Sequence, residues 1–128
     1  RGITALGLSF DRVLTSPYLR ALQTAELVAD ELGLKVQVER TPHLAPDGCP
    51  RALMDLIASQ SSARSRVLVV GHEPYLSELI SVLVAGDERT AITMKKAGLC
   101  KLAMQTARYG RCASLEWLLT PAQAERIR

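Results

Sequence analysis

The feature that most constrains the fold is the run Arg66 to Val70, which leads directly into the turn Gly71-His72-Glu73-Pro74. Its Val-Leu-Val-Val core lacks polar alternation, which is typical of a strand buried on both faces of a parallel sheet. Proline is accepted at the first position of a helix, so the turn is expected to open one. That helix should end near Gly86, and its apolar face is formed by Leu76, Leu79, Ile80 and Leu83.

A second unit near the start of the chain repeats this pattern. Arg12 to Thr15 is a short strand candidate, Ser16 is a favoured N-cap, and Pro17 suits the first helical position. The helix that follows should end at Gly33, with an apolar face of Ala21, Ala25, Val28, Ala29 and Leu32. In open α/β sheets ligands bind beyond the carboxyl ends of the strands, where helix N-termini attract anions. Both turns are therefore predicted anion sites.

The rest of the chain is compatible with the same α/β class. The remaining expected segments are a strand from Lys35 to Arg40, a proline-rich loop from Thr41 to Pro50, a short helix containing Leu53, Leu56 and Ile57, a polar stretch from Ser59 to Ser65, and strands from Leu99 to Met104 and from Ser114 to Leu119. We therefore expect one domain of the α/β class, with strand–helix units first and a strand-rich end.

Composition narrows the function classes. A chain of 128 residues with 48% hydrophobic residues is expected to form one globular domain, and its apolar runs fall far below the roughly 18 residues of a membrane span. The net charge of +3 and the 4% aromatic content disfavour a nucleic-acid partner. The three cysteines, Cys49, Cys100 and Cys112, lack metal-ligand spacing. They favour a reducing cytoplasm as small buried side chains, and no metal or cofactor is expected.

Two residues carry the predicted chemistry. Arg20 lies in the first turn of its helix, so its side chain should lean back over the strand end and grip two phosphate oxygens. His72, between a strand and a helix, is placed to bind a phosphoryl oxygen or move a proton. The alternatives are a solvent-facing arginine beside Tyr18 and a histidine that only caps its helix.

Other polar residues have plainer explanations. Asp47 is a proton-donor candidate, but Asp before glycine is typical of a turn. Glu73 lies beside His72, but acidic residues favour the first helical turn in any case. The other candidates are expected to be surface or core residues: His43, Lys95, Lys96 and Trp117.

Several motifs together resemble one family. Ser16 to Glu26, Ser-Pro-Tyr-Leu-Arg-Ala-Leu-Gln-Thr-Ala-Glu, and Val69 to Pro74, Val-Val-Gly-His-Glu-Pro, are similar to two motifs of the histidine phosphatase superfamily. Three further segments resemble its SixA-type branch of phosphohistidine phosphatases: His43 to Pro46, Lys95 to Gly98 and Leu115 to Pro121. The resemblance implies a three-layer α/β/α fold of the phosphoglycerate mutase-like type.

The resemblance also implies a mechanism. In the family, a histidine of an N-terminal Arg-His-Gly motif attacks the phosphoryl group, and water then releases phosphate without a metal. Arg20 matches the arginine that grips the phosphoryl oxygens, and His72 matches the second catalytic histidine. Ser16 and Glu73 are then expected to bind substrate. A phosphorylated protein, such as a histidine phosphotransfer domain, is the implied partner.

The chain departs from the family pattern because it contains no Arg-His-Gly triplet. Ile3 to Phe10 resembles the tail of the family's first helix, so the nucleophile is expected upstream of residue 1. Without that strand, two strand edges would lie unpaired in the middle of the sheet. The usual glutamate general acid also has no clear match, which favours phosphohistidine over phosphate esters.

Three functions therefore remain open. The first is a phosphohistidine phosphatase, and the second is a general phosphomonoesterase or a mutase-like enzyme. The third is an inactive phosphate-binding module. An upstream Arg-His-Gly would separate the enzymes from the module.

Overall fold

The computed structural model describes residues 10–33, 37–59, 65–87, 89, 99–104 and 106–119. Three parallel strands form its central sheet: β1 (Arg12–Thr15), β2 (Val38–Arg40) and β3 (Val67–Val70). Their order is β2-β1-β3, with Leu14 paired to Glu39 on one side and to Val69 on the other. Successive strands are joined through helices, as parallel pairing requires. The parallel sheet of an α/β fold is thereby confirmed.

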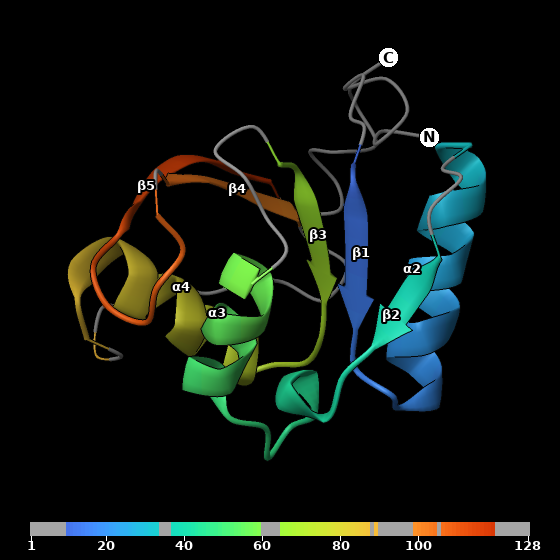
Figure 1. Cartoon of the computed structure of the whole chain (residues 1–128), viewed down its shortest axis with the longest axis horizontal. Helices are drawn as coiled ribbons and strands as arrows, with labels where there is room; N and C mark the ends of the chain where they lie inside the picture. Colours follow the sequence, from blue (N-terminus) through green and yellow to red (C-terminus); the bar gives the residue numbers. More distant parts are fainter. Residues whose placement is uncertain are drawn as a thin grey trace.

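Helices cover both faces of this sheet (Figure 1). Helix α2 (Leu19–Glu31) lies on one side and buries its alanines, Ala21, Ala25 and Ala29, which allow close approach to the strands. Helices α3 (Pro50–Ser59) and α4 (Tyr75–Ala85) lie on the other side, together with the short 3₁₀ helix η1 (Pro42–Leu44). Successive strand residues point to opposite faces, so Val13 and Leu14, both fully buried, belong to different layers. The result is the expected α/β/α layering.

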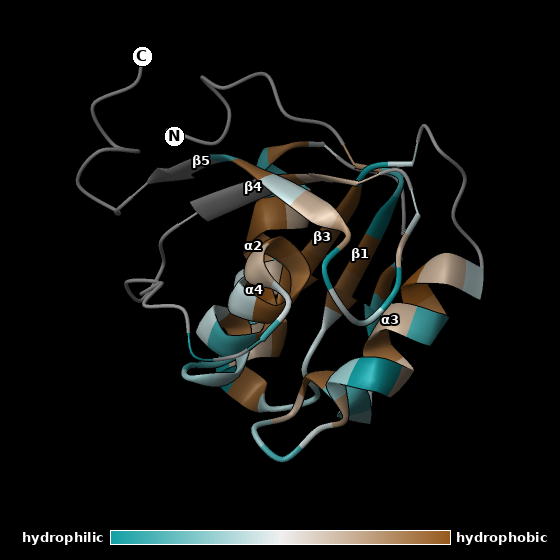
Figure 2. Ribbon diagram, turned by 90° about the vertical axis from the view of Figure 1, so that its left-hand side faces the viewer, coloured by the Kyte–Doolittle hydropathy of each residue, from teal (hydrophilic) through white to brown (hydrophobic). Residues whose placement is uncertain are grey.

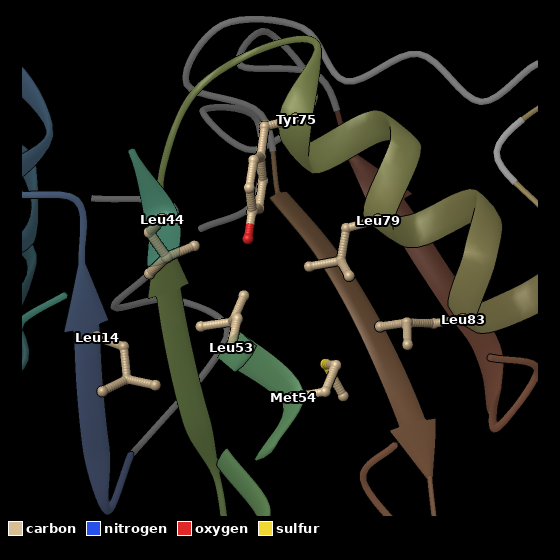
Figure 3. Close-up of a cluster of buried hydrophobic side chains, with 7 residues drawn as sticks. All are labelled: Leu14, Leu44, Leu53, Met54, Tyr75, Leu79 and Leu83. Carbon is tan, nitrogen blue, oxygen red and sulfur yellow. The ribbon is translucent and has the colours of Figure 1, made fainter. Parts of the chain in front are cut away.

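The main core lies between the sheet and the helices α3 and α4. Figure 3 shows Leu14 of β1 facing Leu53 and Met54 of α3, while Leu79 and Leu83 approach from α4. In the hydropathy view, the apolar residues of the strands and helices line the interior of the fold (Figure 2). Burial of these aliphatic side chains supplies the main favourable free energy of folding.

A buried arginine fastens α3 to the sheet. Arg12 is only 7% exposed and lies on the same strand face as Leu14. Its guanidinium donates to both carboxylate oxygens of Glu39, at 3.2 Å each. It also donates to the carbonyls of Leu56 and Ile57, near the C-terminus of α3, at 3.2 and 3.3 Å. A cation is favoured there because helix C-termini carry partial negative charge.

The last two strands form a separate antiparallel pair. These strands, β4 (Leu99–Met104) and β5 (Ala113–Leu119), pair with a register shift between Lys101 and Leu102. Leu102 and Ala113 pack against the same core cluster. Both strands were predicted, with β5 beginning one residue earlier than expected. The start of β5 is linked to the last turn of α4. The amide of Cys112, directly before β5, donates to the carbonyl of Leu83 at 2.9 Å.

The structure corrects the expected burial of the strand at Val67–Val70. This strand, β3, is half-buried rather than buried on both faces. Among the described residues it pairs only with β1, so one of its edges carries no neighbouring strand. An edge strand keeps contact with solvent along its unpaired side.

Several predicted boundaries also differ. Helix α2 begins at Leu19 with Tyr18 as its N-cap, so Ser16 and Pro17 precede the helix. Pro74 is the N-cap of α4 rather than its first helical residue, and η1 interrupts the predicted loop. Of the predicted strand Lys35–Arg40, residues 37–40 lie within the described residues and Val38–Arg40 are strand.

The cysteines were expected to be buried, and the structure tests this for two of the three. Cys49 is exposed and Cys112 half-buried, so the prediction of buried cysteines is wrong for Cys49. The side chains of Cys100 and Trp117, the segment Ile3–Ser9 and the lysine pair lie outside the described residues. Within the described part of the chain, no helix combines the length and the apolarity needed to cross a bilayer.

Candidate active site

The two predicted anion-binding turns lie at the same edge of the sheet. Strands β1 and β3 are parallel neighbours, with Thr15 paired to Val70, so both end at this edge. Ser16 follows β1 directly, and its backbone amide donates to the carbonyl of Val70 at 3.0 Å. Gly71 and His72 follow β3 at the same level of the sheet. The strand register therefore brings together two polar turns that are 56 residues apart in the sequence.

A short hydrogen bond joins these turns. Nε2 of His72 lies 2.7 Å from Oγ of Ser16. Ser16 is fully buried, and its Oγ also accepts from the backbone amide of Tyr18 at 3.2 Å. The ring of Tyr18 meets the imidazole edge to face, with the ring centroids 5.2 Å apart and the planes at 64°. His72 is thus held by a hydroxyl and an aromatic ring from the segment between β1 and α2.

The backbone of His72 opens the helix that follows. Its carbonyl accepts from the amide of Leu76 at 2.9 Å. Neither Tyr18 nor Pro74, the N-cap residues of α2 and α4, makes a side-chain capping hydrogen bond. At the start of α4, however, the amide of Ser77 donates to the Glu73 carboxylate. The first amides of an α-helix have no partner inside the helix and favour an anion nearby. Both helix starts lie beside the Ser16–His72 pair, but at α4 the amides of Leu76 and Ser77 already have partners, so the start of α2 is the better place for an anion.

Arg20 lies in the first turn of α2, two residues after the tyrosine that contacts His72. It is exposed, and among the described residues its guanidinium makes no hydrogen bond or ion pair. Side chains of a helix lean toward its N-terminus, which here is the edge that carries Ser16. Arg20 is therefore accessible to an anionic ligand. That its guanidinium and His72 grip one phosphate stays a prediction.

Glu73 lies beside His72 but is directed at its own helix. One carboxylate oxygen accepts from the backbone amide of Ser77 at 3.1 Å, and the other accepts from the Ser77 hydroxyl. An acidic side chain at a helix N-terminus is stabilising through these amides and the helix dipole. The contacts match the capping alternative for this residue, and its predicted role in substrate binding stays a prediction.

Comparisons with known proteins find one family that is similar in sequence and in fold. Residues 4–45, which include β1, Ser16 and α2, match the model of the histidine phosphatase superfamily (branch 1). The fold is similar to the solved structure of the protein histidine phosphatase SixA complexed with tungstate, with a TM-score of 0.80 and 26% identity. That similarity covers 94% of this chain and 74% of the SixA chain. Together, these matches support a SixA-type member of the histidine phosphatase superfamily.

Two curated relatives are similar to the chain in sequence. It is 36% identical over 83 residues to the phosphohistidine phosphatase SixA of Escherichia coli K12, and 40% identical over 105 residues to an uncharacterized protein of Picosynechococcus sp. PCC 7002. The matches cover 62% and 80% of this chain, respectively. The chain spans 50% of the first relative's length and 62% of the second's. The SixA-type assignment made from the motifs is confirmed.

A third segment, the loop that contains η1, contacts the start of α4. The carbonyl of His43, in η1, accepts a hydrogen bond from the hydroxyl of Tyr75, the first residue of α4. Thr41 fixes the start of η1, since its hydroxyl accepts from the amide of His43 at 3.2 Å. Gly48 closes the loop so tightly that an added Cβ would lie 2.3 Å from the carbonyl oxygen of His43. His43 is thus a packing residue through its backbone, and Asp47 is an exposed turn residue.

Burial raises the pKa of Tyr75 to about 12, and the nearby Cys49 thiol adds to the increase. The neutral hydroxyl therefore stabilises the folded state fully below the unfolded pKa of about 10. This stabilisation is lost as the pH rises from about 10 to about 12, and its upper bound is roughly 3 kcal/mol. We expect the free energy of unfolding to fall more steeply across this window in the native protein than in Tyr75→Phe. Urea titrations at several alkaline pH values measure this difference, and equal slopes for the two proteins would contradict it.

Sequence reasoning missed one residue of the site. Tyr18 was considered only as a neighbour of Arg20, whereas its ring and its amide contact His72 and Ser16, respectively. The available signal was an aromatic residue directly after a turn that ends a buried strand. Among the described residues, no three His, Cys, Asp or Glu side chains gather as a metal ion would require.

Proposed function

We propose that the whole protein is a phosphohistidine phosphatase that removes a phosphoryl group from a histidine of a phosphorylated protein. The observation that carries the proposal is the 2.7 Å contact between His72 and Ser16, which joins two helix starts into one anion-facing edge. The exposed Arg20 adds a charged bidentate donor beside it. Such donors stabilise the charge of a phosphoryl group in flight.

The proposed reaction has two displacements. A histidine nitrogen of the enzyme attacks phosphorus, the bond from phosphorus to the substrate imidazole breaks, and that imidazole leaves. Water then attacks the phosphorus of the enzyme phosphohistidine, the enzyme nitrogen leaves, and phosphate and a proton are released. Covalent catalysis of this kind divides one difficult step into two easier ones. Arg20 holds the phosphoryl oxygens, and His72 stabilises the transferring group.

The nucleophile is the part of this proposal that the 128 residues do not supply. Of their two histidines, His72 bonds to Ser16, and His43 lies in the loop fixed by Tyr75. A further strand could pair in parallel with β3 along the side that faces no other described strand. The C-terminal end of that strand would lie beside Ser16 and His72. We propose that the nucleophilic histidine of the whole protein follows such a strand.

The fold of the SixA relative supports phosphohistidine as the substrate class. That relative is named a phosphohistidine phosphatase, and the similar solved structure is a complex with tungstate, a tetrahedral oxyanion. Among the described residues, the carboxylate next to His72 in the chain is that of Glu73, and it is engaged in capping α4 through Ser77. It is therefore a poor candidate for a general acid. A phosphohistidine needs little help from a general acid, since its leaving imidazole is readily protonated. A histidine phosphotransfer domain would be a suitable partner, and the cytoplasm a suitable compartment.

The test compares two substrate classes with the full-length protein. We expect phosphate release from a phosphohistidine peptide or phosphotransfer domain to exceed release from p-nitrophenyl phosphate and from a phosphoserine peptide. A chelator should leave the rate unchanged, because the proposed chemistry uses only side chains. A preference for the phosphate esters would favour the general phosphomonoesterase instead. Absence of turnover on every substrate, with retained phosphate binding, would favour the inactive module.

A further inference from the structure

Ser16 was expected to bind substrate, but its contacts indicate another role. Its side chain is fully buried, and both of its hydrogen bonds are made within the protein. Oγ accepts from the amide of Tyr18 at 3.2 Å and lies 2.7 Å from Nε2 of His72. A hydroxyl has two lone pairs but a single proton to donate. The question is therefore which group receives that proton.

Among the described residues, His72 offers the acceptor within reach of the Ser16 hydroxyl proton. Tyr18 contributes an N–H, which is a donor and cannot accept. Buried polar groups are rarely left without a partner, and in the described part of the structure every buried side-chain nitrogen or oxygen has at least one hydrogen-bond partner. In neutral His72 the proton of Ser16 therefore lies on the hydrogen bond to Nε2, which must be the unprotonated ring nitrogen.

This assignment fixes the other ring nitrogen. A neutral imidazole carries one proton, so Nδ1 of His72 is the N–H donor when Nε2 accepts from Ser16. The edge-to-face contact with Tyr18 restrains the ring plane at 64° to the tyrosine ring. A hydrogen bond and an aromatic contact on the same imidazole leave little freedom to flip the ring.

We propose that Ser16 is a positioning residue that holds His72 as its Nδ1–H tautomer, with Nδ1–H as the donor presented to the phosphoryl group. The proposal rests on the proposed function for its catalytic meaning, but the tautomer itself is a property of the resting protein. Ser16 acts through His72 and does not touch the substrate. Its loss should change the state and orientation of the imidazole before it changes the affinity for phosphate.

The first test reads the tautomer directly, without any substrate. Two-bond proton–nitrogen NMR correlations on the full-length ¹⁵N-labelled protein distinguish the protonated from the unprotonated ring nitrogen. At a pH where the imidazole is neutral, we expect Nδ1 of His72 to be the protonated nitrogen. Ser16→Ala should shift the His72 signals toward the Nε2–H form. Ser59→Ala removes a hydroxyl that, within the described residues, bonds to the carbonyl of Leu56 at the far end of α3, so it should change nothing.

The variant proteins need a check on folding and on assignment. The amide spectrum of Ser16→Ala should match that of the native protein away from the site, and Ser16→Thr, which keeps a hydroxyl, should retain the Nδ1–H form if it folds. His72→Gln identifies which signals belong to His72 rather than His43. An Nε2–H tautomer in the native protein, or an unchanged tautomer in Ser16→Ala, would overturn the proposal.

The second test asks whether the effect on turnover passes through His72. In the phosphohistidine assay, Ser16→Ala should lower kcat at least about tenfold with little change in KM, because a misoriented donor weakens transition-state stabilisation. The same change made in His72→Ala should have almost no further effect, which is the signature of two residues acting as one unit. Equal effects in both backgrounds would refute positioning through His72. Failure of the native protein to turn over phosphohistidine would reject the proposed function but leave the NMR result intact.

Discussion

Replacing Arg20 with alanine in the full-length protein is expected to lower phosphohistidine turnover by on the order of 10²-fold or more. The exposed guanidinium has no partner among the described residues and lies two residues from the tyrosine that packs on His72. In the proposed mechanism, its loss would remove a bidentate contact to the phosphoryl oxygens, over which charge is spread in the transition state. Stopped or continuous phosphate-release assays give kcat and kcat/KM for the two proteins.

Two matched variants separate the geometry of Arg20 from its charge. Arg20→Lys keeps the charge but not the planar fork, so its activity should fall between those of the native protein and Arg20→Ala. Arg66→Ala removes the same charge from an exposed position just before β3, at the opposite edge of the sheet, and should leave turnover within about twofold. If Arg20→Ala turned over substrate as fast as Arg66→Ala, the guanidinium would have no part in catalysis.

The parts of the fold that could be predicted are those with strong local signals. The unbroken apolar run at Val67–Val70 and the helical spacing of Leu79 and Leu83 reappear as β3 and α4. Gly86 ends α4 in the left-handed conformation, with φ of 91°, as a C-cap glycine should. Periodicity, glycine and proline act within a few residues, so a single sequence displays them.

The predictions that failed depend on contacts between distant segments. Serine is a residue type favoured at N-caps, but the hydroxyl of Ser16 bonds to Tyr18 and His72. The helix begins three residues later, at Leu19. The burial of β3 depends on which strands lie beside it, and the sequence of a strand does not state its neighbours. Local capping preference is worth about 1 kcal/mol, which is no more than the net contribution of one tertiary hydrogen bond.

The sequence predicted at which end of the sheet the site lies, but it did not predict the contacts between the site residues. Parallel pairing places the ends of β1 and β3 together, so Ser16 and His72 were expected at one edge. Their 2.7 Å contact and the packing of Tyr18 require the actual register and rotamers. Arg20 and Glu73 both lie near the start of a helix, but their contacts could not be predicted either. Among the described residues the Arg20 guanidinium has no partner, whereas the Glu73 carboxylate bonds to Ser77.

The unpaired edge of β3 connects the fold with the missing part of the mechanism. In the described structure, the parallel sheet ends at β3 and the β4–β5 pair stands as a separate ladder. An unpaired strand edge presents a row of free donors and acceptors that favours another strand. Under the proposed function, anion binding and covalent attack would therefore be separable: the donors would lie on the described segments, and the nucleophile would come with the added strand.

Residues 1–128 alone are accordingly expected to show no phosphatase turnover while keeping weak affinity for phosphate. Arg20, His72 and the start of α2 still offer donors to an oxyanion. A partial site of this kind should bind with a Kd in the millimolar range or weaker, which corresponds to about −4 kcal/mol at most. Titration of the folded 128-residue chain with inorganic phosphate, followed by amide NMR, measures the affinity. The amides near Ser16 and His72 should shift most.

The same samples are assayed for turnover of a phosphohistidine peptide. Arg20→Ala should abolish the phosphate-dependent shifts, and Arg66→Ala should preserve them, because only the first removes a donor from the edge where Ser16 and His72 lie. Robust turnover by residues 1–128 would place the nucleophile within them. His43 would then be the candidate, and the alignment of the two motifs with the family would be wrong. Turnover that appears only in the longer protein would tie attack to the segment that pairs with β3.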